Sequence, residues 1–319
     1  MLNQGKRKTL SSMDIFDFGF AWNWQYDQDF VGILTQTCQN QGLRLLEINP
    51  GNLFSITSLL LAKQISFQAF LDRASDTDEG FYPLVSWSRK KAKAYINRFW
   101  LARRSWDKAA MHLAITQAGL SAPPILLLPP FCDQPDLPIP DLQLLEGCFA
   151  VKPNHGGGGK GVKTGFTTWD QVLEARREYP ADEYLLQAQV IPAILEGHPA
   201  WFRIIYAFGK IFPNWWDPTT HIYVPIREAQ SCTQPYSLSP LWEITACIAQ
   251  ICQLELFSTE IALTPDGRFQ IVDYVNDPID LRLQSSTYEG VPDFIVAAIA
   301  QELAAFVASR CLKEPVYAA

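Results

Sequence analysis

The chain has 319 residues, of which 48% are hydrophobic and 18% charged, and its formal net charge is −7 with a pI of about 5.2. This length suits two or three lobes that share interfaces and bury a sizeable core. The acidic balance removes the general electrostatic attraction to nucleic acid and anionic membranes, and no apolar run reaches the ~18 residues needed to span a bilayer. We therefore expect neither nucleic acid nor a membrane as a partner.

Cysteine usage and the first residues indicate the compartment. The seven cysteines are scattered, odd in number and without metal-site spacing, which favours a reducing environment. Residues 1–12 include basic side chains but are followed by Asp14 and Asp17 instead of the apolar core of an export signal. These features predict a cytoplasmic protein whose first residues form a frayed end.

The first part of the chain alternates strand and helix patterns. Strands are predicted over residues 15–21, 43–48 and 66–71, and helices over residues 29–41 and 53–63. Gly42 closes the first helix, and a polar segment over residues 72–80 then interrupts the pattern. This order predicts a small α/β domain over residues 1–104.

From residue 105 the pattern changes to helices and paired strands. Asp107 caps a helix that has Lys108 in its first turn and stops at Gly119. Further strands are predicted at residues 125–128, from Phe149 into the next loop, at 184–191, and in hairpins at 202–216 and 257–276, with helices at 169–178, 241–252 and 294–309. This pattern predicts an α+β region with antiparallel sheets, divided into residues 105–190 and 191–319.

The loop after the Phe149 strand has the composition of a polyphosphate-binding loop. A strand ending in Lys152 leads through His155 into four glycines and then Lys160; the glycines are Gly156, Gly157, Gly158 and Gly159. Successive glycines let backbone N–H groups turn toward an anion, and the two lysines supply positive charge. The loop lacks the Gly-Lys-Ser/Thr ending of a P-loop. His155 either contacts phosphate or faces solvent.

A bound triphosphate needs Mg²⁺, which usually binds one or two carboxylates together with phosphates and water. In the last hairpin, a two-residue loop at Asp266-Gly267 places Glu260 directly opposite Asp273. The alternative is a turn at Pro-Asp-Gly with a bulged glycine, which shifts the pairing by one residue and puts Glu260 on the same face as Asn276.

Neither regular register gathers all three polar side chains. A β-bulge near Tyr274 and Val275, combined with the first register, brings Glu260, Asp273 and Asn276 together, and we predict this arrangement as the metal site. Without the glycine loop, the favoured interpretation would be a solvated edge strand whose acids prevent aggregation.

Taken in order, these motifs resemble the ATP-grasp superfamily, which includes D-alanine:D-alanine ligase, glutathione synthetase and the glutamate ligases that modify peptide ends. The resemblance covers roughly residues 105–310 and rests on Asp107-Lys108, Val151-Lys152-Pro153 with the glycine loop, Gln187 to Val190, Arg203, Glu260, Asp273 and Asn276. It implies an ATP-grasp fold in which two antiparallel α+β subdomains clasp ATP, preceded by a small α/β domain.

The resemblance also implies residue roles. Lys108 and Lys152 lie near the ATP phosphates, the glycine loop folds over them, and Gln187 to Val190 line the adenine edge. The chain departs from the family at two places. The family usually has Glu-x-Asn where this chain has Asp273 and Asn276 with one extra residue between them. Acidic residues are common where this chain has Gln187, Ala188 and Gln189.

In the ligase members, a substrate carboxylate attacks the γ-phosphate and an amine captures the acyl phosphate. By this resemblance Arg203 contacts the transferring phosphoryl group and Arg282 holds the acyl substrate, although a surface salt bridge is the alternative for each. His221 either contacts substrate or packs within its loop. The predicted function is therefore an ATP-dependent carboxylate–amine ligase that uses Mg²⁺ and small-molecule substrates. Many relatives pair, so a homodimer is compatible with it.

Two other hypotheses fit the same motifs. One is a kinase that phosphorylates a hydroxyl group, such as an inositol-phosphate or sugar kinase, but the acidic balance speaks against a basic acceptor patch. The other is a nucleotide-binding module without turnover, which the irregular spacing of Asp273 and Asn276 favours.

Overall fold

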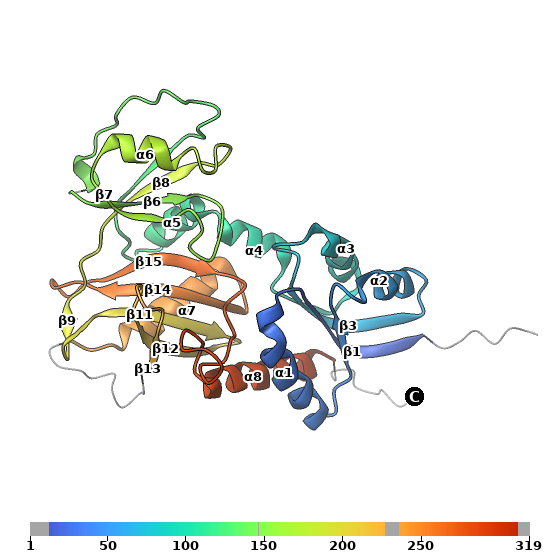
Figure 1. Cartoon of the computed structure of the whole chain (residues 1–319). Helices are drawn as coiled ribbons and strands as arrows, with labels where there is room; N and C mark the ends of the chain where they lie inside the picture. Colours follow the sequence, from blue (N-terminus) through green and yellow to red (C-terminus); the bar gives the residue numbers. More distant parts are fainter. Residues whose placement is uncertain (1–12, 146, 227–235, 312–319) are drawn as a thin grey trace, which may run out of the picture. The chain divides into compact units, whose positions relative to one another are not determined.

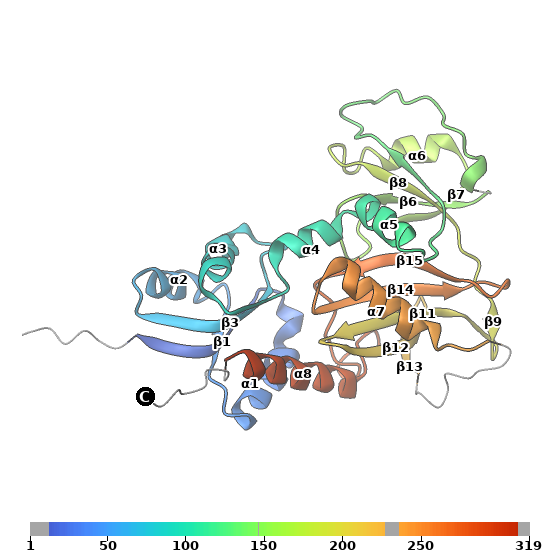
Figure 2. The ribbon, with the colours of Figure 1, turned by 180° about the vertical axis from the view of Figure 1, so that it is seen from behind.

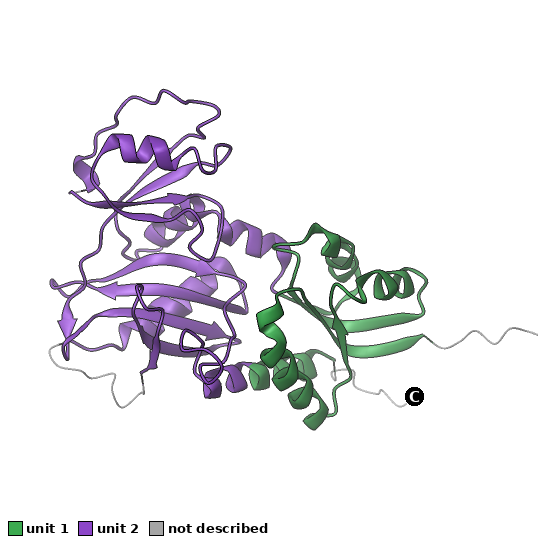
Figure 3. Ribbon diagram, in the orientation of Figure 1, with its two compact units in different colours: residues 1–96, 300–319 green, residues 97–299 purple. Residues whose placement is uncertain are grey.

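The computed structural model describes residues 13–145, 147–226 and 236–311. Its contacts divide the chain into two compact units, residues 1–96 with 300–319 and residues 97–299 (Figure 3). The first unit thus ends at Ile96, whereas the sequence placed this boundary at residue 104, and it also takes the end of the chain that the sequence assigned to the last subdomain. The predicted frayed segment, residues 1–12, and Cys232 lie outside the described residues.

Unit 1 contains a four-stranded parallel sheet of order β2-β1-β3-β4. Its elements are β1 (Asp14–Trp22), α1 (Gln28–Asn40), β2 (Leu45–Ile48), α2 (Leu53–Leu61), β3 (Ile65–Arg73), α3 (Tyr82–Lys91) and β4 (Ala94–Ile96), with 3₁₀ turns at Gln25–Asp27 and Glu79–Phe81. Figures 1 and 2 show α2 and α3 on one face of the sheet and α1 on the other. Phe20 and Ala21 of β1 point to opposite faces of the sheet and are both fully buried, as expected for a strand covered on both faces.

Unit 2 begins with α4 (Phe99–Trp106) and α5 (Lys108–Gln117) and contains two antiparallel sheets. The small sheet has the order β5-β8-β6-β7, formed by β5 (Ile125–Leu128), β6 (Phe149–Pro153), β7 (Lys163–Phe166) and β8 (Tyr184–Ala188), with a 3₁₀ turn at Gln143–Leu145. Helix α6 (Trp169–Ala175) packs on this sheet through Trp169 and Val172, which join Val151 and Leu186 in one core.

The large sheet of unit 2 has the order β13-β12-β11-β14-β15. Its strands are β11 (Trp201–Ala207), β12 (Lys210–Trp216), β13 (Tyr223–Pro225), β14 (Leu256–Leu263) and β15 (Phe269–Asn276), and a small ladder joins β9 (Ile194–Leu195) to β10 (His198–Pro199). Helix α7 (Pro240–Cys252) covers one face (Figure 2). Phe202 and Ile204 of β11 pack into this core, so Arg203 between them points to the opposite face.

The turn of the last hairpin differs from the predicted two-residue loop. Leu263 pairs with Phe269, so the prediction of a two-residue loop at Asp266-Gly267 is wrong. Gly267 has φ +85°, as the alternative turn with a bulged glycine requires. Both turns suit the local sequence, and Pro265 favours the longer one because its fixed φ starts a type I turn.

Two register shifts along this hairpin restore the predicted carboxylate pair. Val272 is an extra residue on β15, so Glu260 lies opposite Asp273 despite the longer turn. A second shift, at residues 274–275, is the bulge that the sequence predicted, and it sets Asn276 opposite Ser258. The polar side chains are therefore placed by two irregularities instead of one.

The last helix, α8 (Asp293–Cys311), is long and apolar enough to cross a membrane by length and composition. The sequence interpretation did not raise this candidate. The buried residues of α8 follow a helical stripe; they are Ile295, Val296, Ile299, Ala300, Leu303, Ala304, Val307 and Cys311. That spacing is typical of a helix in the core of a protein.

Candidate active site

Lys152 extends from β6 of the small sheet to β15 of the large sheet. The residue is 9% exposed, and its Nζ donates a hydrogen bond to the carbonyl of Val272 at 3.2 Å. Burial lowers the pKa of the Lys152 ammonium, and the charges of Asp273 and Glu260 oppose that shift. A buried ammonium whose hydrogen-bond partner is a neutral carbonyl would be stabilised further by an anion bound beside it.

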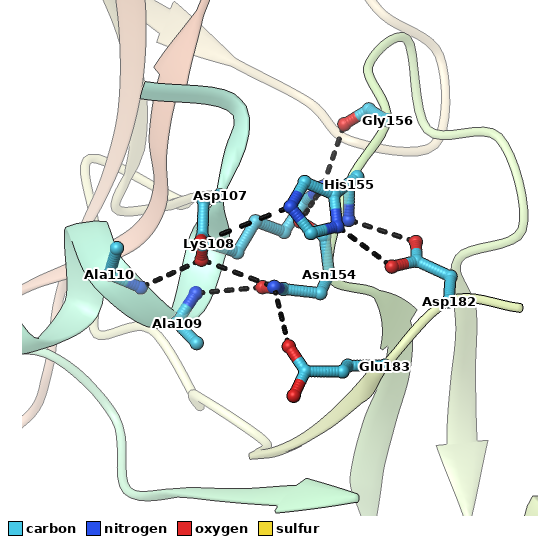
Figure 4. Close-up of polar contacts among 9 residues, drawn as sticks. All are labelled: Asp107, Lys108, Ala109, Ala110, Asn154, His155, Gly156, Asp182 and Glu183. Carbon is cyan, nitrogen blue, oxygen red and sulfur yellow. Dashed lines mark hydrogen bonds and ion pairs between the residues drawn. The ribbon is translucent and has the colours of Figure 1, made fainter. Parts of the chain in front are cut away.

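Lys108 approaches the same region from the first turn of α5 (Figure 4). Asp107 caps this helix by accepting a hydrogen bond from the backbone N–H of Ala110 at 2.9 Å. The Lys108 ammonium donates to the carbonyl of Gly156 at 2.7 Å, so it reaches the start of the glycine loop. Burial lowers its pKa, Asp273 raises it, and Lys152 lowers it further.

Asn154 joins the cap of α5 to the glycine loop and is a residue that the sequence analysis missed. It is fully buried, and its Oδ1 accepts a hydrogen bond from the N–H of Ala109 at 2.8 Å. Its Nδ2 donates to Asp107 and to Glu183, at 3.1 and 3.2 Å (Figure 4). Asn154 therefore determines where Lys108 lies relative to β6. The only sequence signal is its position beside the predicted loop.

The glycine loop is exposed and depends on unusual backbone angles. Gly156, Gly158 and Gly159 have φ of 130°, 62° and 71°, and a Cβ at any of them would meet no atom within 4 Å. These glycines therefore serve the backbone conformation, not close packing. Gly157, also in the predicted loop, is equally open, and Lys160 is exposed at the end of the run.

His155 pairs with acids beside the loop. Its Nδ1 lies 2.8 Å from Asp182 Oδ1, and its backbone N–H donates to the same carboxylate at 2.9 Å. The Nε2 atom lies 3.9 Å from Asp107, and the side chain is 57% exposed. This arrangement ties the first residue of the loop to the turn just before β8.

The carboxylates of Glu260 and Asp273 lie on the face of the large sheet that carries Arg203. Glu260 accepts from Arg203 Nη1 at 2.9 Å and from Trp201 Nε1 at 3.2 Å. Asn276 Nδ2 donates to Asp273 Oδ2 at 2.8 Å. Glu260, Asp273 and Asn276 therefore come together as the sequence predicted, and Trp201 is an additional partner that it did not identify.

The two carboxyl groups have opposite pKa shifts, although burial acts to raise the pKa of both. Burial raises the pKa of Glu260, and the charge of Asp273 adds to that shift while Arg203 opposes it. Against its own burial, Asp273 has a lowered pKa because Lys152 and Lys108 lie nearby and Asn276 donates to it. Both lysines and both carboxylates therefore lie within one electrostatic neighbourhood.

The donor set on the large sheet suits Mg²⁺. Among the described residues, no three His, Cys, Asp or Glu side chains are placed to hold a metal by themselves. Two half-buried carboxylates face each other here, and the Asn276 amide, which donates to Asp273, has its carbonyl oxygen left as a further ligand. Mg²⁺ commonly takes one or two carboxylates and completes its octahedron with phosphate and water. The residues therefore fit the ion.

Arg203 and His221 both contact the ring of Trp216. The Arg203 guanidinium lies 4.9 Å from the ring centroid of Trp216, and the His221 ring stacks on Trp216 with centroids 5.5 Å apart and planes at 11°. The structure thus brings His221 next to the arginine, through a tryptophan whose role the sequence did not identify.

Arg282 forms the ion pair that was the alternative to a substrate contact. Its Nη2 lies 2.6 Å from Asp280 and 3.6 Å from Glu289. Arg282 shares an electrostatic partner with Arg203: burial raises the pKa of Tyr223 to about 12, and the charges of both arginines act to lower it.

The residues predicted at the adenine edge lie on or beside β8. Gln187 of β8 is buried and donates to the Val272 carbonyl at 3.2 Å. Val190, predicted at the adenine edge, lies just beyond the end of β8 and is half-buried.

Comparison with known proteins identifies the fold. No protein-family model matches the sequence, and no curated protein matches it. Solved structures do match: the ATP complex of D-alanine:D-alanine ligase from Bacillus anthracis is 13% identical, with a TM-score of 0.64, covering 95% of this chain and 98% of that chain. The chain therefore has the ATP-grasp fold, as its motifs predicted.

Two further similar structures extend the comparison. The ATP-grasp ligase PsnB, complexed with a precursor peptide and AMPPNP, is 11% identical with a TM-score of 0.61, over 95% of this chain and 99% of that one. A RimK-domain ATP-grasp protein from Sphaerobacter thermophilus is 15% identical with a TM-score of 0.58, over 91% and 99%. At these identities the similarity establishes the fold alone.

Proposed function

We propose that this protein is an ATP-dependent ligase that joins a carboxylate to an amine, forming an amide or peptide-like bond through an acyl phosphate. The observation that supports it best is the electrostatic neighbourhood shared by Lys108, Lys152, Glu260 and Asp273. The ammonium groups of Lys152 on the small sheet and Lys108 on α5, together with carboxylates on the large sheet, suit a polyphosphate. Its charge would be neutralised by the lysines directly and by the carboxylates through Mg²⁺.

The chain's own residues have distinct tasks in this proposal. Lys108 and Lys152 bind the phosphates, and the N–H groups of the glycine loop cover them. Glu260, Asp273 and Asn276 hold Mg²⁺, which supplies positive charge at the transferring phosphoryl group. Arg203 orients that group while its contact with Glu260 and Trp216 keeps it in place.

Turnover can be tested with the purified protein, Mg·ATP and a panel of carboxylic acids. With hydroxylamine as the amine, a substrate acid should give a hydroxamate and ADP. Lys152→Ala and Asp273→Asn should each lower turnover by about 100-fold or more, because each removes charge stabilisation at the reacting phosphate. Lys210→Ala, which changes an exposed lysine at the start of β12, is the matched control and should keep its turnover.

Three outcomes would contradict the proposal. Unchanged turnover in both site variants would mean that the chemistry occurs elsewhere. Phosphorylation of hydroxyl compounds alone would favour the kinase hypothesis. Binding of ATP without turnover under every substrate mixture would favour a nucleotide-binding module.

A further inference from the structure

The hydroxyl of Tyr274 joins three elements of unit 2. Tyr274 belongs to the second register shift of β15 and is 2% exposed. Its oxygen lies 2.8 Å from Nδ1 of His112 on α5 and 3.3 Å from Nε2 of Gln187 on β8. A buried hydroxyl between two nitrogen atoms on separate elements restrains the strand that carries it.

The directions of these hydrogen bonds follow from the chemistry of the partners. The amide nitrogen of Gln187 can only donate, so the Tyr274 oxygen accepts from it. Burial lowers the pKa of His112, which favours the neutral imidazole. A neutral ring can accept at Nδ1, and the Tyr274 O–H then donates there, which leaves no buried proton unpaired.

Gln187 links this hydroxyl to the first register shift. Its Nε2 also donates to the carbonyl of Val272, the extra residue of β15, at 3.2 Å. Lys152 donates to the same carbonyl. An ionised acid at position 187 would have no N–H for either partner, so this network requires the amide.

The same contact also fixes the helix that carries Lys108. His112 lies one helical turn after Lys108, so both side chains leave the same face of α5. The Tyr274–His112 hydrogen bond thus holds the lysine-bearing helix against the strand that bears Asp273.

We propose that Tyr274 is a positioning residue for the metal site: its hydroxyl, held by His112 and Gln187, fixes the irregular part of β15 so that Asp273 and Asn276 meet Glu260. This inference rests on the proposed function, because it assumes that these three side chains hold the Mg²⁺ of Mg·ATP.

The first test compares Tyr274→Phe with the native full-length protein by calorimetric titration. Phenylalanine keeps the ring and removes only the hydroxyl. Affinity for Mg²⁺ at saturating ATP should fall about fivefold to tenfold, the effect of one lost hydrogen bond. Affinity for ATP without Mg²⁺ should stay within about twofold.

Tyr184→Phe is the matched control. Tyr184 is also fully buried, and its hydroxyl donates to Ala175 and accepts from the N–H of Tyr179. This variant should lose stability and keep its Mg²⁺ affinity. The inference is overturned if Tyr274→Phe keeps native Mg²⁺ affinity, or if it loses ATP affinity equally with and without Mg²⁺.

A second test needs no nucleotide and so separates this inference from the proposed function. Chemical unfolding is measured for Tyr274→Phe, His112→Leu and the double variant. The two changes should be coupled, with a factor of about five between the observed and additive unfolding constants. Additive effects would refute the network even if Mg·ATP binds. Coupling in a protein that does not bind Mg·ATP would refute the function and, with it, the metal role of Tyr274.

Discussion

Glu260 is subject to opposing interactions at the scale of a single residue. Arg203 and Trp201 each bind one of its carboxylate oxygens, yet burial and the facing Asp273 raise its pKa. Asp273, beside Lys152 and Lys108, has the opposite shift. The pair therefore keeps one proton, and so carries one negative charge instead of two, more readily than two exposed acids would. A divalent cation between the carboxylates would remove the repulsion that favours this protonated state.

The raised pKa of Glu260 predicts how metal binding depends on pH. Because its pKa lies above the ordinary 4.5, Glu260 takes up a proton at a higher pH than an exposed glutamate. By linkage, its contribution to the metal-free fold is present below pH 4.5 and is lost as the pH rises through the raised pKa. Binding of Mg²⁺ requires the charged form, so Mg²⁺ affinity at saturating ATP should weaken as the pH falls from neutral.

Titrations of Mg²⁺ at several pH values can check this dependence. Glu260→Gln should bind Mg²⁺ more weakly at neutral pH and should show a flatter pH profile than the native protein. Protonation of ATP affects both proteins equally, so the comparison isolates Glu260. Parallel profiles would show that another group titrates.

At the scale of elements, the glycine loop combines open and crowded positions. Gly158 and Gly161 both have positive φ, 62° and 73°. A Cβ at Gly158 meets open space, whereas one at Gly161 would lie 2.6 Å from Tyr179 and 2.7 Å from Pro153. Tyr179 could move, but the ring of Pro153 at the end of β6 is held in the sheet.

Alanine substitutions should separate these two requirements. Gly158→Ala should cost about 1–2 kcal/mol of unfolding free energy, the cost of the left-handed backbone alone. Gly161→Ala should lose a further ~1–3 kcal/mol because of the clash. Chemical denaturation of the two variants measures the difference, and equal losses would mean that the loop relaxes around residue 161.

At the scale of the whole molecule, the candidate nucleotide site belongs to unit 2 alone. The lysines and the carboxylates to which we assign phosphate and Mg²⁺ binding all lie within residues 97–299. Unit 1 has its own parallel sheet and core. A ligand that binds only the folded form of one unit stabilises that unit by mass action.

Hydrogen exchange with and without Mg·ATP can test this division. At a ligand concentration ~100 times its dissociation constant, the gain is about 2.7 kcal/mol, so exchange in β6 and β15 should slow by up to about 100-fold. The amides of β1 and β3 serve as internal controls and should change little. Equal slowing in both units would show that the nucleotide also engages unit 1.

Sequence patterns predicted most elements but not every connection. The strand over residues 15–21 and the helix over residues 241–252 have strong periodicity, and both are present. Helix α3 and strand β4 were not predicted, because the polar segment before them interrupts the α/β pattern and β4 is only three residues long. The boundary at residue 96 follows from contacts between distant segments, which no local pattern encodes.

In the candidate site, too, the residues in short motifs were predicted, whereas those that depend on contacts between distant segments were not. Lys152, the glycine loop, Glu260 and Asp273 were identified because their chemistry is visible in short motifs. Asn154 and Tyr274 were not identified as partners, since the residues that bind them lie on segments far away in the chain. Their side chains acquire a role only when those segments meet.

The amino-acid sequence by itself predicted the fold class and identified the glycine loop and the two carboxylates as candidates, because hydrophobic period, glycine content and strand alternation are local properties. The tertiary structure alone decided between the two turns of the last hairpin, added the register shift at Val272, and set the contacts that hold β15. A register shift of one residue reverses which face a side chain occupies, and competing local turns differ little in free energy. Packing against α5 and β8 therefore selects between them.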